Sequence, residues 1–373
     1  MGKRNDGEGS IRERQNGLFE ARLRLPDGAQ RSFYGKTRSE VVKKLRDAQR
    51  AVEQGHAPAP ARLTLGEFLQ DYFVTAPPPG LAPKSLLHYR MAVKLYIVPA
   101  LGKLKLGDVT RPRVQAMLNG LSERGLSAAT VIHTRATLSV ALEKALGDGL
   151  VTYNAAKRAE TPSLRRRKVK ALTPEDARCI MDAFSGHWLE PLVTVALGTG
   201  ARQAELLGLG WEDVNLDACT VTIEKQLQRI DGAYRLTPTK SETSNRTLPL
   251  PPVAVDALRR ERVRQAEARL AAGDAWQGFG HVFVTALGGY LNGSTVTHVF
   301  QKRLATAGLD RIRWHDLRHG CASLLLAAGT PMRVVMEQLG HSQMALTANT
   351  YSHVAPALMQ EAAERLQRAL GGA

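Results

Sequence analysis

The 373-residue sequence has few cysteines, few aromatic side chains (5%) and no long apolar run. Its three cysteines, Cys179, Cys219 and Cys321, lie far apart without a CxxC pair, so we expect no disulfide framework and a reducing compartment. No apolar stretch reaches the roughly 18 residues that a membrane span requires, so we expect no membrane partner. The N-terminus lacks the apolar segment of a secretory leader, and we therefore predict a cytoplasmic protein.

Several catalytic motifs are also missing. The Tyr-Gly-Lys-Thr stretch at 34–37 resembles the end of a phosphate-binding P-loop, but the position that needs the first glycine of that motif is Gln30. The sequence contains no HExxH, GxSxG, paired-cysteine zinc or EF-hand pattern. Nucleotide, metal and serine-triad chemistry therefore have no support, and we expect no metal site and no cofactor.

Positive charge is the strongest compositional feature. The sequence has 51 Lys and Arg against 35 Asp and Glu, which gives a net charge of +16. An excess of this size favours a polyanionic partner, with nucleic acid first, because neutralised phosphates release counterions. A membrane surface is the weaker alternative, since the charge is spread along the chain and not concentrated in one amphipathic helix. A merely soluble basic protein is the third possibility.

Residues 10–55 have the pattern of strands followed by a helix. Apolar and polar residues alternate over 19–25, a Pro-Asp-Gly turn follows, and 31–34 has the pattern of a return strand. A capping box at 37–40 predicts a helix that covers the apolar face of this hairpin. We expect three arginines of this hairpin to point outward: Arg22, Arg24 and Arg31. They either contact DNA, as in proteins that bind DNA through a β-sheet, or form a solvated basic face.

A second segment, from 63 to about 160, follows a proline-containing linker and carries only helical patterns. Apolar residues at helical spacing predict a helix after Ser85 that stops at Pro99, and further helices near 114–121 and 131–142. We expect a compact helical domain with cations on its outside, including Lys103. The basic run after it is either a solvated linker or a segment that tracks a phosphate backbone: Arg165, Arg166 and Arg167.

The remaining sequence mixes helices with one cluster of short strands. Residues 219–224 and 246–250 are β-rich, 234–239 is predicted to pair with the first of them, and an amphipathic helix is predicted over 357–370. The fold class is thus predicted to be α+β and mainly α. We expect three domains: residues 1–62 with a small β-sheet and a helix, residues 63–164 all α, and residues 165–373 mainly helical with a small antiparallel sheet.

A set of cations near one tyrosine points to the chemistry. Arg202 comes close to the start of a helix, where free amides and the helix dipole favour an anion. His315 and Arg318 are spaced so that both can project from one helix face. His341 directly follows a predicted helix end, and Tyr351 comes shortly after it. Taken singly, Arg202 also fits a surface salt bridge and Tyr351 a core tyrosine.

The order of these motifs resembles the catalytic domain of the tyrosine recombinases, the phage-integrase family. GxRxxEL, a lysine in a strand turn, HxLRH, LGH and a terminal TYxHV follow one another over about residues 171–356, which is a specific match. The all-α segment is similar to the core-binding domain of that family, and residues 1–62 look like an arm-site-binding domain. The resemblance implies a site-specific recombinase that integrates or excises a phage or mobile element.

The resemblance also assigns roles to the residues. Arg202 and Arg318 would grip the scissile phosphate of DNA, Lys240 would protonate the departing 5′-oxygen, and Tyr351 would be the nucleophile. Two histidines would complete the pocket: His315 and His341. Lys225 lies in the same strand cluster as Lys240 and is the alternative to it.

Elementary phosphoryl-transfer chemistry favours the same residue types. Charge spreads over the non-bridging oxygens in the transition state, and guanidiniums that always stay charged suit them better than lysines. A tyrosine with a pKa of about 10 needs a base, for which His315 is the candidate, while His341 can donate a hydrogen bond to phosphate. The leaving alkoxide needs an acid, such as a lysine among cations that lower its pKa. A covalent phosphotyrosine conserves the bond energy, so neither ATP nor a metal is required.

Partners and alternatives follow from the resemblance. It implies double-stranded DNA attachment sites, a homotetramer on DNA, and DNA-bending or excision factors, in the bacterial cytoplasm at the nucleoid. The terminal helix either packs on its own subunit or is exchanged between protomers. A type IB topoisomerase, which uses the same strand chemistry, and a DNA-binding protein without catalysis are the competing functions. The latter would need none of His315, Lys240 and Tyr351.

Overall fold

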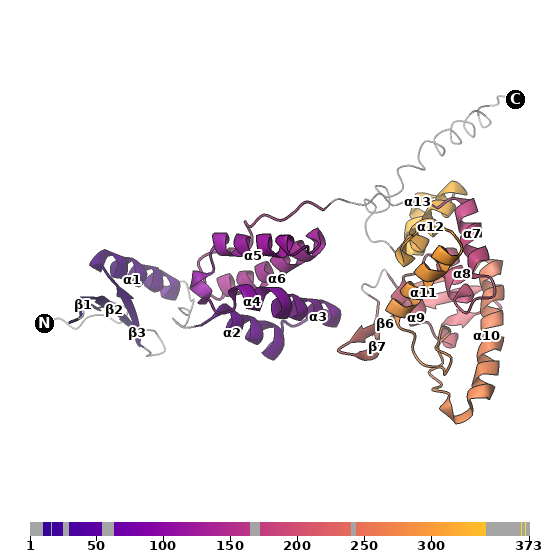
Figure 1. Cartoon of the computed structure of the whole chain (residues 1–373), viewed down its shortest axis with the longest axis horizontal. Helices are drawn as coiled ribbons and strands as arrows, with labels where there is room; N and C mark the ends of the chain where they lie inside the picture. The colour runs from indigo at the N-terminus through magenta and orange to yellow at the C-terminus, as the bar shows by residue number, and fades with distance from the viewer. Residues whose placement is uncertain are drawn as a thin grey trace. The chain divides into compact units, whose positions relative to one another are not determined.

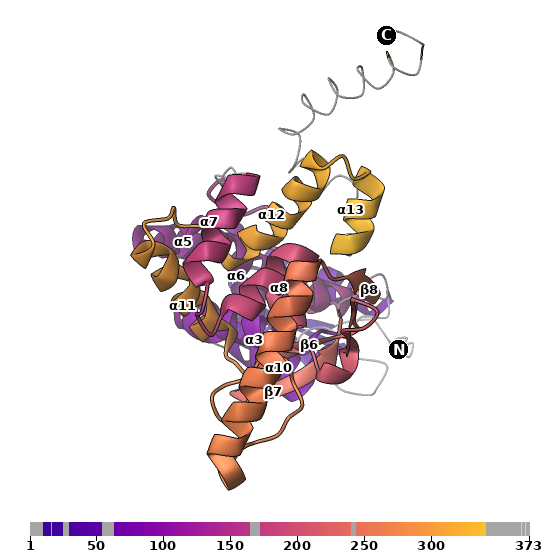
Figure 2. The same cartoon turned by 90° about the vertical axis from the view of Figure 1, so that its right-hand side faces the viewer.

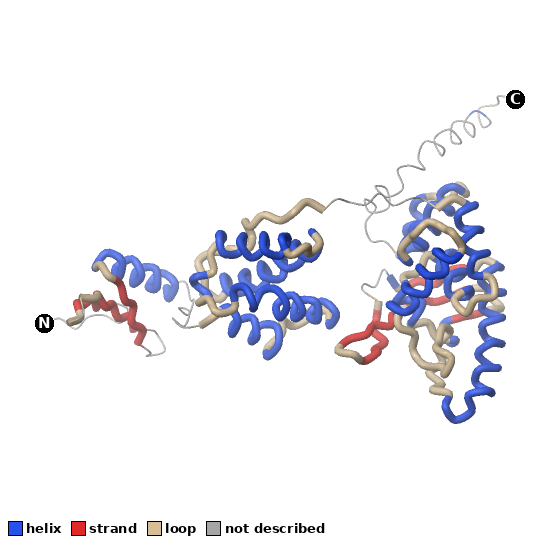
Figure 3. The backbone as a smooth tube through the Cα atoms, viewed as in Figure 1, coloured by secondary structure: helices blue, strands red, loops and turns tan. Residues whose placement is uncertain are grey.

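The structure, a computed structural model, describes residues 10–15, 17–24, 30–53, 63–164, 172–239 and 244–340, together with residues 367 and 370. The chain forms two compact units, Met1–Arg166 and Arg167–Ala373 (Figure 1). Helices predominate and the strands form small antiparallel sheets, so the predicted α+β, mainly α fold class is confirmed (Figure 3). Most of the terminal helix predicted over 357–370 lies outside the described residues.

The first unit begins with a three-stranded antiparallel sheet and one helix. The elements are β1 (Ser10–Glu13), β2 (Phe19–Arg24), β3 (Gln30–Gly35) and α1 (Arg38–Glu53), in the strand order β1-β2-β3. Thr37 Oγ1 accepts a hydrogen bond of 3.3 Å from the backbone N–H of Glu40 at the helix start, where the cap was predicted. The sequence did not predict β1, because Ile11 is its one apolar residue. The helix covers the apolar face of the sheet, and their shared core comprises Ala21, Leu23, Val41, Leu45 and Ala48.

The rest of the first unit is helical. Its elements are α2 (Leu65–Gln70), η1 (Asp71–Thr75), α3 (Pro83–Ala92), η2 (Val93–Ile97), α4 (Val98–Leu101), η3 (Leu106–Asp108), α5 (Arg111–Glu123) and α6 (Ala128–Gly147). The prediction that a helix stops at Pro99 is wrong, because α3, η2 and α4 continue to Leu101. The η2 turn is π-helical, and the backbone N–H of Val98 donates to the Val93 carbonyl. This wider turn accommodates a proline that has no N–H to donate.

The second unit contains two small sheets within a mainly helical body (Figure 2). Its strands are β4 (Val214–Asn215), β5 (Thr220–Ile223), β6 (Lys225–Ile230), β7 (Ala233–Pro238) and β8 (Arg246–Pro249). Its helices are α7 (Pro174–Phe184), α8 (Glu190–Thr199), α9 (Gln203–Leu207), η4 (Trp211–Asp213), α10 (Pro252–Ala272), η6 (Gly273–Ala275), α11 (Gly293–Thr306), α12 (Trp314–Ala327) and α13 (Met332–Leu339). Among the helices that the structure describes, none combines the length and the apolar content needed to cross a membrane.

The strand pairing differs from the predicted one. The sequence suggests that 219–224 pairs with 234–239, but β5 lies between β4 and β8, whereas β7 pairs with β6. Asp231 and Gly232 have φ angles of 50° and 84°, the left-handed values that a two-residue hairpin turn needs. Only Glu224 separates β5 from β6, and therefore the two strands look like one in the sequence.

Helix α8 is the buried centre of the second unit and sets the position of the site. Eight of its ten residues are buried, and α10 and α12 pack against it (Figure 2). The helix ends at Gly200, whose φ is 66°. A Cβ at this position would lie 2.5 Å from Cδ2 of Leu339, so the positive φ and this close neighbour both favour glycine. The chain then enters α9 through Arg202.

Candidate active site

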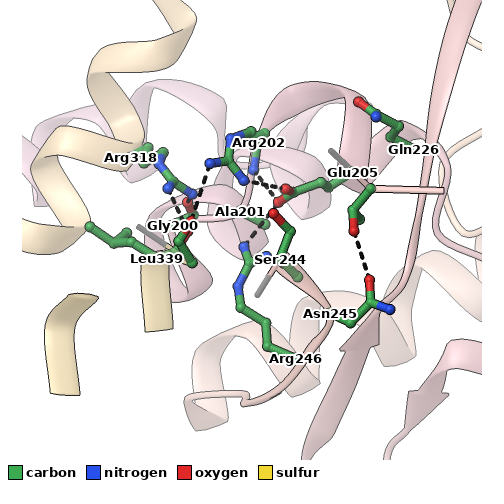
Figure 4. Close-up of polar contacts among 12 residues, drawn as sticks. Gly200, Ala201, Arg202, Glu205, Gln226, Ser244, Asn245, Arg246, Arg318 and Leu339 are labelled. Atoms are coloured by element: carbon green, nitrogen blue, oxygen red, sulfur yellow. Dashed lines mark hydrogen bonds and ion pairs between the residues drawn. The ribbon is translucent and has the colours of Figure 1, made fainter. Parts of the chain in front are cut away.

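Arg202 occupies the N-cap position of α9, directly after the turn that ends α8. Its backbone N–H donates to Glu205 Oε2 over 2.8 Å, and its Nη1 donates to Oε1 over 2.7 Å. The Glu205 side chain is 2% exposed, whereas that of Arg202 is 38% exposed. The carboxylate therefore fixes one edge of a guanidinium that stays accessible (Figure 4). Burial alone raises the pKa of Glu205, but the charge and hydrogen bonds of Arg246, aided by Arg202, keep the pKa below its ordinary value.

Arg318 reaches the same place from α12 and is 3% exposed. Its Nη1 donates to the Gly200 carbonyl oxygen over 2.8 Å, and its Nη2 donates to the Leu339 carbonyl oxygen. Arg202 Nη2 donates to the carbonyl oxygen of the next residue, Gly340, over 3.4 Å. Two arginines from distant parts of the sequence are thus anchored at neighbouring carbonyls (Figure 4). Two backbone carbonyls thus hold the Arg318 guanidinium in place.

His315 lies one turn before Arg318 on α12, and part of the residue is exposed to solvent. Its ring meets the ring of His319 edge to face, with centroids 5.0 Å apart and an interplanar angle of 89°. Burial and the positive charges around it, first those of His319 and Arg318, lower the pKa of His315 to about 4. The imidazole is therefore neutral at neutral pH and able to accept a proton.

Comparison with known proteins identifies the family. The phage integrase family model matches residues 170–357, about half of the chain, and a phage integrase N-terminal SAM-like domain matches residues 64–122. The chain belongs to the phage integrase family. It is a tyrosine-type site-specific recombinase, an enzyme that cleaves and rejoins DNA strands, and the predicted family is confirmed.

Similar proteins cover almost the whole recombinase. An integrase of Streptomyces ambofaciens is 30% identical over 365 residues, which are 94% of this chain and 93% of that protein. The tyrosine recombinase XerC-like protein of Caldanaerobacter subterraneus subsp. tengcongensis is 28% identical over 355 residues, 90% of this chain and 91% of that protein.

Solved integrase structures share the fold. The Tn1549 transposon integrase in complex with transposon right end DNA gives a TM-score of 0.69 at 18% identity, covering 82% of this chain and 99% of that chain. A lambda integrase dimer bound to a COC′ core site gives a TM-score of 0.57 at 23% identity, covering 94% of this chain and 96% of that chain. At these identities the likeness establishes the architecture of the recombinase.

One of the two lysines in the strand cluster is already engaged. Lys225 Nζ lies 2.6 Å from Glu212 Oε1 and 3.0 Å from Asp213 Oδ2. Burial alone lowers the pKa of Lys225, but the two carboxylates outweigh it and raise the pKa above its ordinary value. A lysine whose proton is stabilised in this way is a poor general acid. Lys225 is therefore poorly suited to donate a proton to the leaving oxygen, and the assignment of Lys240 stays a prediction.

Three predicted catalytic residues lie outside the described residues: Lys240, His341 and Tyr351. The chain is anchored beside the first two of these positions. Thr239 Oγ1 donates to Asn245 Oδ1 over 2.7 Å, and Gly340, which precedes residue 341, accepts the hydrogen bond from Arg202. Within the described ranges, no three His, Cys, Asp or Glu side chains gather as a metal site would require.

Sequence reasoning missed the residue at the centre of the N-terminal sheet, Glu20, whose side chain is 0% exposed. It accepts hydrogen bonds from Arg12 Nε over 2.7 Å and from Arg14 Nε over 3.0 Å. Arg22 Nε donates over 3.0 Å and the Tyr34 hydroxyl over 3.2 Å. Hydrogen bonds, first that of Arg14, hold the pKa of Glu20 far below its usual range. Arg22 thus belongs to a cluster of arginines around one carboxylate. Arg12, another member, was not predicted because the strand that carries it, β1, was not predicted.

The other predicted DNA-binding residues are placed only in part. Arg24 lies in β2 and Arg31 in β3, and the structure does not describe their side chains. In the register of β2 and β3, Arg31 pairs with Leu23, and Arg22 pairs with Ser32. Arg22 and Arg31 are therefore not cross-strand partners. Lys103 is exposed shortly after α4. The basic run lies outside the described residues: Arg165, Arg166 and Arg167.

Proposed function

We propose that this recombinase integrates or excises a mobile genetic element at double-stranded DNA attachment sites, through a 3′-phosphotyrosine intermediate. Relatives named after such elements support the proposal. The ICEBs1 integrase of Bacillus subtilis is 25% identical over 71% of this chain, and a prophage phiRv2 integrase of Mycobacterium tuberculosis is 24% identical over 96%. The net charge of +16 suits a partner that carries a dense row of phosphates.

Arg202 and Arg318 hold the scissile phosphate in this proposal. Each guanidinium can donate to two oxygens, and its charge does not depend on pH. The fixed positions of both guanidiniums support the assignment, because preorganised donors stabilise a transition state without further reorganisation. His341 donates a hydrogen bond to a non-bridging oxygen of the same phosphate.

The reaction exchanges one phosphate ester for another. The Tyr351 hydroxyl oxygen attacks phosphorus, the bond from phosphorus to the 5′-oxygen breaks, and His315 takes the tyrosine proton. Lys240 gives a proton to the leaving 5′-oxygen, which leaves a free 5′-hydroxyl and a DNA 3′-phosphate ester on Tyr351. A 5′-hydroxyl from a second strand then attacks the ester and reseals the DNA. The lowered pKa keeps His315 unprotonated at neutral pH, as a base must be, and the negative charge of a bound phosphate raises that pKa toward the value that a general base needs.

The assembly follows from the same proposal. We propose a homotetramer on paired sites, with residues 1–62 binding arm-type DNA, 63–164 binding the core site, and 165–373 carrying out catalysis. DNA-bending or excision factors are expected as partners. Basic side chains are proposed to contact the DNA: Arg22, Arg24, Arg31, Lys103, Arg165, Arg166 and Arg167. The cluster around Glu20 supports this role for the sheet, because it keeps three arginines together on one surface.

One observation carries the proposal: Arg318 and Arg202 donate to the carbonyls of Leu339 and Gly340, the two residues that precede His341. The test is to incubate the protein with pooled DNA from the flanks of its own element, carrying nicked suicide sites that trap the covalent complex. A denaturing gel and peptide mass spectrometry then look for a 3′-phosphate adduct on Tyr351. Sequencing the trapped DNA gives the site and distinguishes recombination at one sequence from topoisomerase-like capture at many.

An adduct on another residue, or salt-sensitive DNA binding without any adduct, would contradict the proposed chemistry. Binding alone would favour the non-catalytic DNA-binding alternative. The nicked substrate matters because the short strand released by cleavage diffuses away, so that the resealing step cannot remove the adduct.

A further inference from the structure

Arg246, the first residue of β8, uses its donor groups in three different contacts. Its Nη2 donates to Glu205 Oε2 over 2.9 Å, and its Nη1 donates to the Ser244 carbonyl oxygen over 2.8 Å. Its Nε donates to the Gln338 carbonyl oxygen over 2.8 Å. The Arg246 side chain is 8% exposed, so these contacts are shielded from water.

Each acceptor belongs to a different part of the site. Glu205 is the carboxylate that orients the Arg202 guanidinium. Ser244 is the first described residue after positions 240–243, which include Lys240. Gln338 belongs to the last turn of α13, which leads toward His341. The Arg246 guanidinium thus links the carboxylate that orients Arg202 to the two chain segments that lead to Lys240 and His341.

The end of α13 is held by arginine side chains. The carbonyl oxygens of three successive residues, 338, 339 and 340, accept hydrogen bonds from Arg246, Arg318 and Arg202, respectively. The last carbonyls of a helix lack partners within the helix and carry a partial negative charge, so cations stabilise them. Gly340 turns the chain with a φ of 65°, and a Cβ there would lie 3.2 Å from Arg246 Nη1. The chain therefore leaves α13 in close contact with this guanidinium.

We propose that Arg246 is a positioning residue for strand cleavage, which holds the segments next to Lys240 and His341 in register with the Arg202–Glu205 pair. The inference rests on the proposed function, because it concerns the same site. Arg246 does not touch DNA in this role and acts through the residues that do. The planar fork of an arginine can serve three acceptors in fixed directions, which the single ammonium group of a lysine cannot do.

Two substitutions separate positioning from folding. Arg246→Gln removes the charge beside buried Glu205, and Arg246→Lys keeps that charge but loses the fork. Arg264→Gln is the matched control, because Arg264 Nη2 also pairs, over 2.6 Å, with a carboxylate that is 2% exposed, Glu261. Both residues of that control pair belong to α10, away from the contacts described above.

The readout is the single-turnover rate of adduct formation on the nicked site recovered by the trapping experiment, with the DNA dissociation constant and Tm measured alongside. A misplacement of catalytic groups by about 1 Å costs roughly 10²-fold in rate. We expect both Arg246 variants to cleave roughly 10²-fold more slowly at unchanged DNA affinity, and Arg264→Gln to stay within about threefold of wild type. Arg246→Lys is expected to lose less Tm than Arg246→Gln, because it keeps a positive charge beside buried Glu205.

A sulfur-substituted substrate tests the link to Lys240. Replacing the bridging 5′-oxygen by sulfur gives a leaving thiolate that needs no general acid, because a thiol has a pKa of only about 8.5. We expect this substrate to restore much of the rate of Arg246→Lys, as it should for Lys240→Ala. If Arg246 had only a structural role, the ratio of the cleavage rates on the sulfur and oxygen substrates would be the same for Arg246→Lys as for wild type.

Three outcomes would overturn the inference: Arg246 variants that cleave as fast as Arg264→Gln, a loss confined to DNA affinity or Tm, or no recovery on the sulfur substrate. The wild-type protein in the same assay separates this inference from the proposed function. A wild-type adduct on Tyr351 with unaffected Arg246 variants refutes only the positioning role. A wild-type protein without an adduct refutes the proposed function itself, and with it the inference.

Discussion

The carbonyl oxygen of Gly200 accepts a hydrogen bond of 2.8 Å from Nη1 of Arg318. Gly200 also ends α8 two residues before Arg202, so one backbone turn sets the positions of both arginines. The turn needs a positive φ, and its surroundings leave no room for a side chain. A structural glycine is thus part of the geometry of the proposed phosphate site.

Gly200→Ala tests this turn. The new Cβ would lie 2.5 Å from Leu339 Cδ2 and 3.2 Å from Cys321 Sγ, so we expect a loss of about 1–3 kcal/mol from overpacking in addition to the cost of the left-handed backbone. Gly186→Ala is the control, because Gly186 has a φ of 68° and a Cβ there would meet no atom within 4 Å. Urea unfolding measures the free energy of unfolding of both variants, and the difference between their losses gives the cost of overpacking. Equal losses would contradict a tight contact at Gly200.

Tyr351→Phe is expected to bind attachment-site DNA with wild-type affinity and to form no covalent complex, because phenylalanine lacks the attacking oxygen. Gel-shift titration measures the first property and trapping on nicked DNA the second. Covalent trapping by the variant at the wild-type level would remove Tyr351 from the nucleophile's role.

Arg202→Ala and Arg318→Ala should each slow strand cleavage by roughly 10³-fold or more, judging from arginines that stabilise other phosphoryl-transfer transition states. Arg318→Lys should lose nearly as much, because lysine lacks the rigid fork that donates to the Gly200 carbonyl through Nη1 and to the Leu339 carbonyl through Nη2. Single-turnover rates at saturating DNA measure the effect. A loss below about tenfold would assign these arginines to structural roles.

The histidine pair predicts how stability depends on pH. The pKa of His315 is lowered to about 4 in the folded protein, whereas an unfolded histidine titrates near about 6.5. As the pH falls through this interval, the unfolded chain takes up the proton first, so the free energy of unfolding should decrease. His315→Gln should show a smaller decrease between about pH 7 and about pH 5 in urea unfolding. An unchanged slope would mean that His315 titrates normally.

Deletion of residues 1–62 should spare cleavage of an isolated core site and impair recombination of a full attachment site. The reason is that the sheet and its arginine cluster lie before residue 63, whereas Arg202, His315 and Arg318 lie in the second unit. Recombination assays on both substrates compare the truncated and complete proteins. Equal recombination of the full site would rule out arm binding by this segment.

The sequence by itself determined the family and the residue types of the site. Arg202, His315 and Arg318 stand within short motifs whose chemistry can be recognised without knowing their neighbours in space. Helical spacing and the Thr37 cap predicted α1 for the same reason, since both signals lie within a few residues of chain. Local patterns of this kind do not depend on how the rest of the chain folds.

The tertiary structure alone decided how these residues are supported. Arg246 and Gln338 are 92 positions apart, and no local pattern links them. The pairing of β5 with β8, the engagement of Lys225 by Glu212, and the arginine cluster around Glu20 were hidden for the same reason. A buried charge is stable only where opposite charges or hydrogen-bond partners surround it, and those partners come together only when distant segments pack.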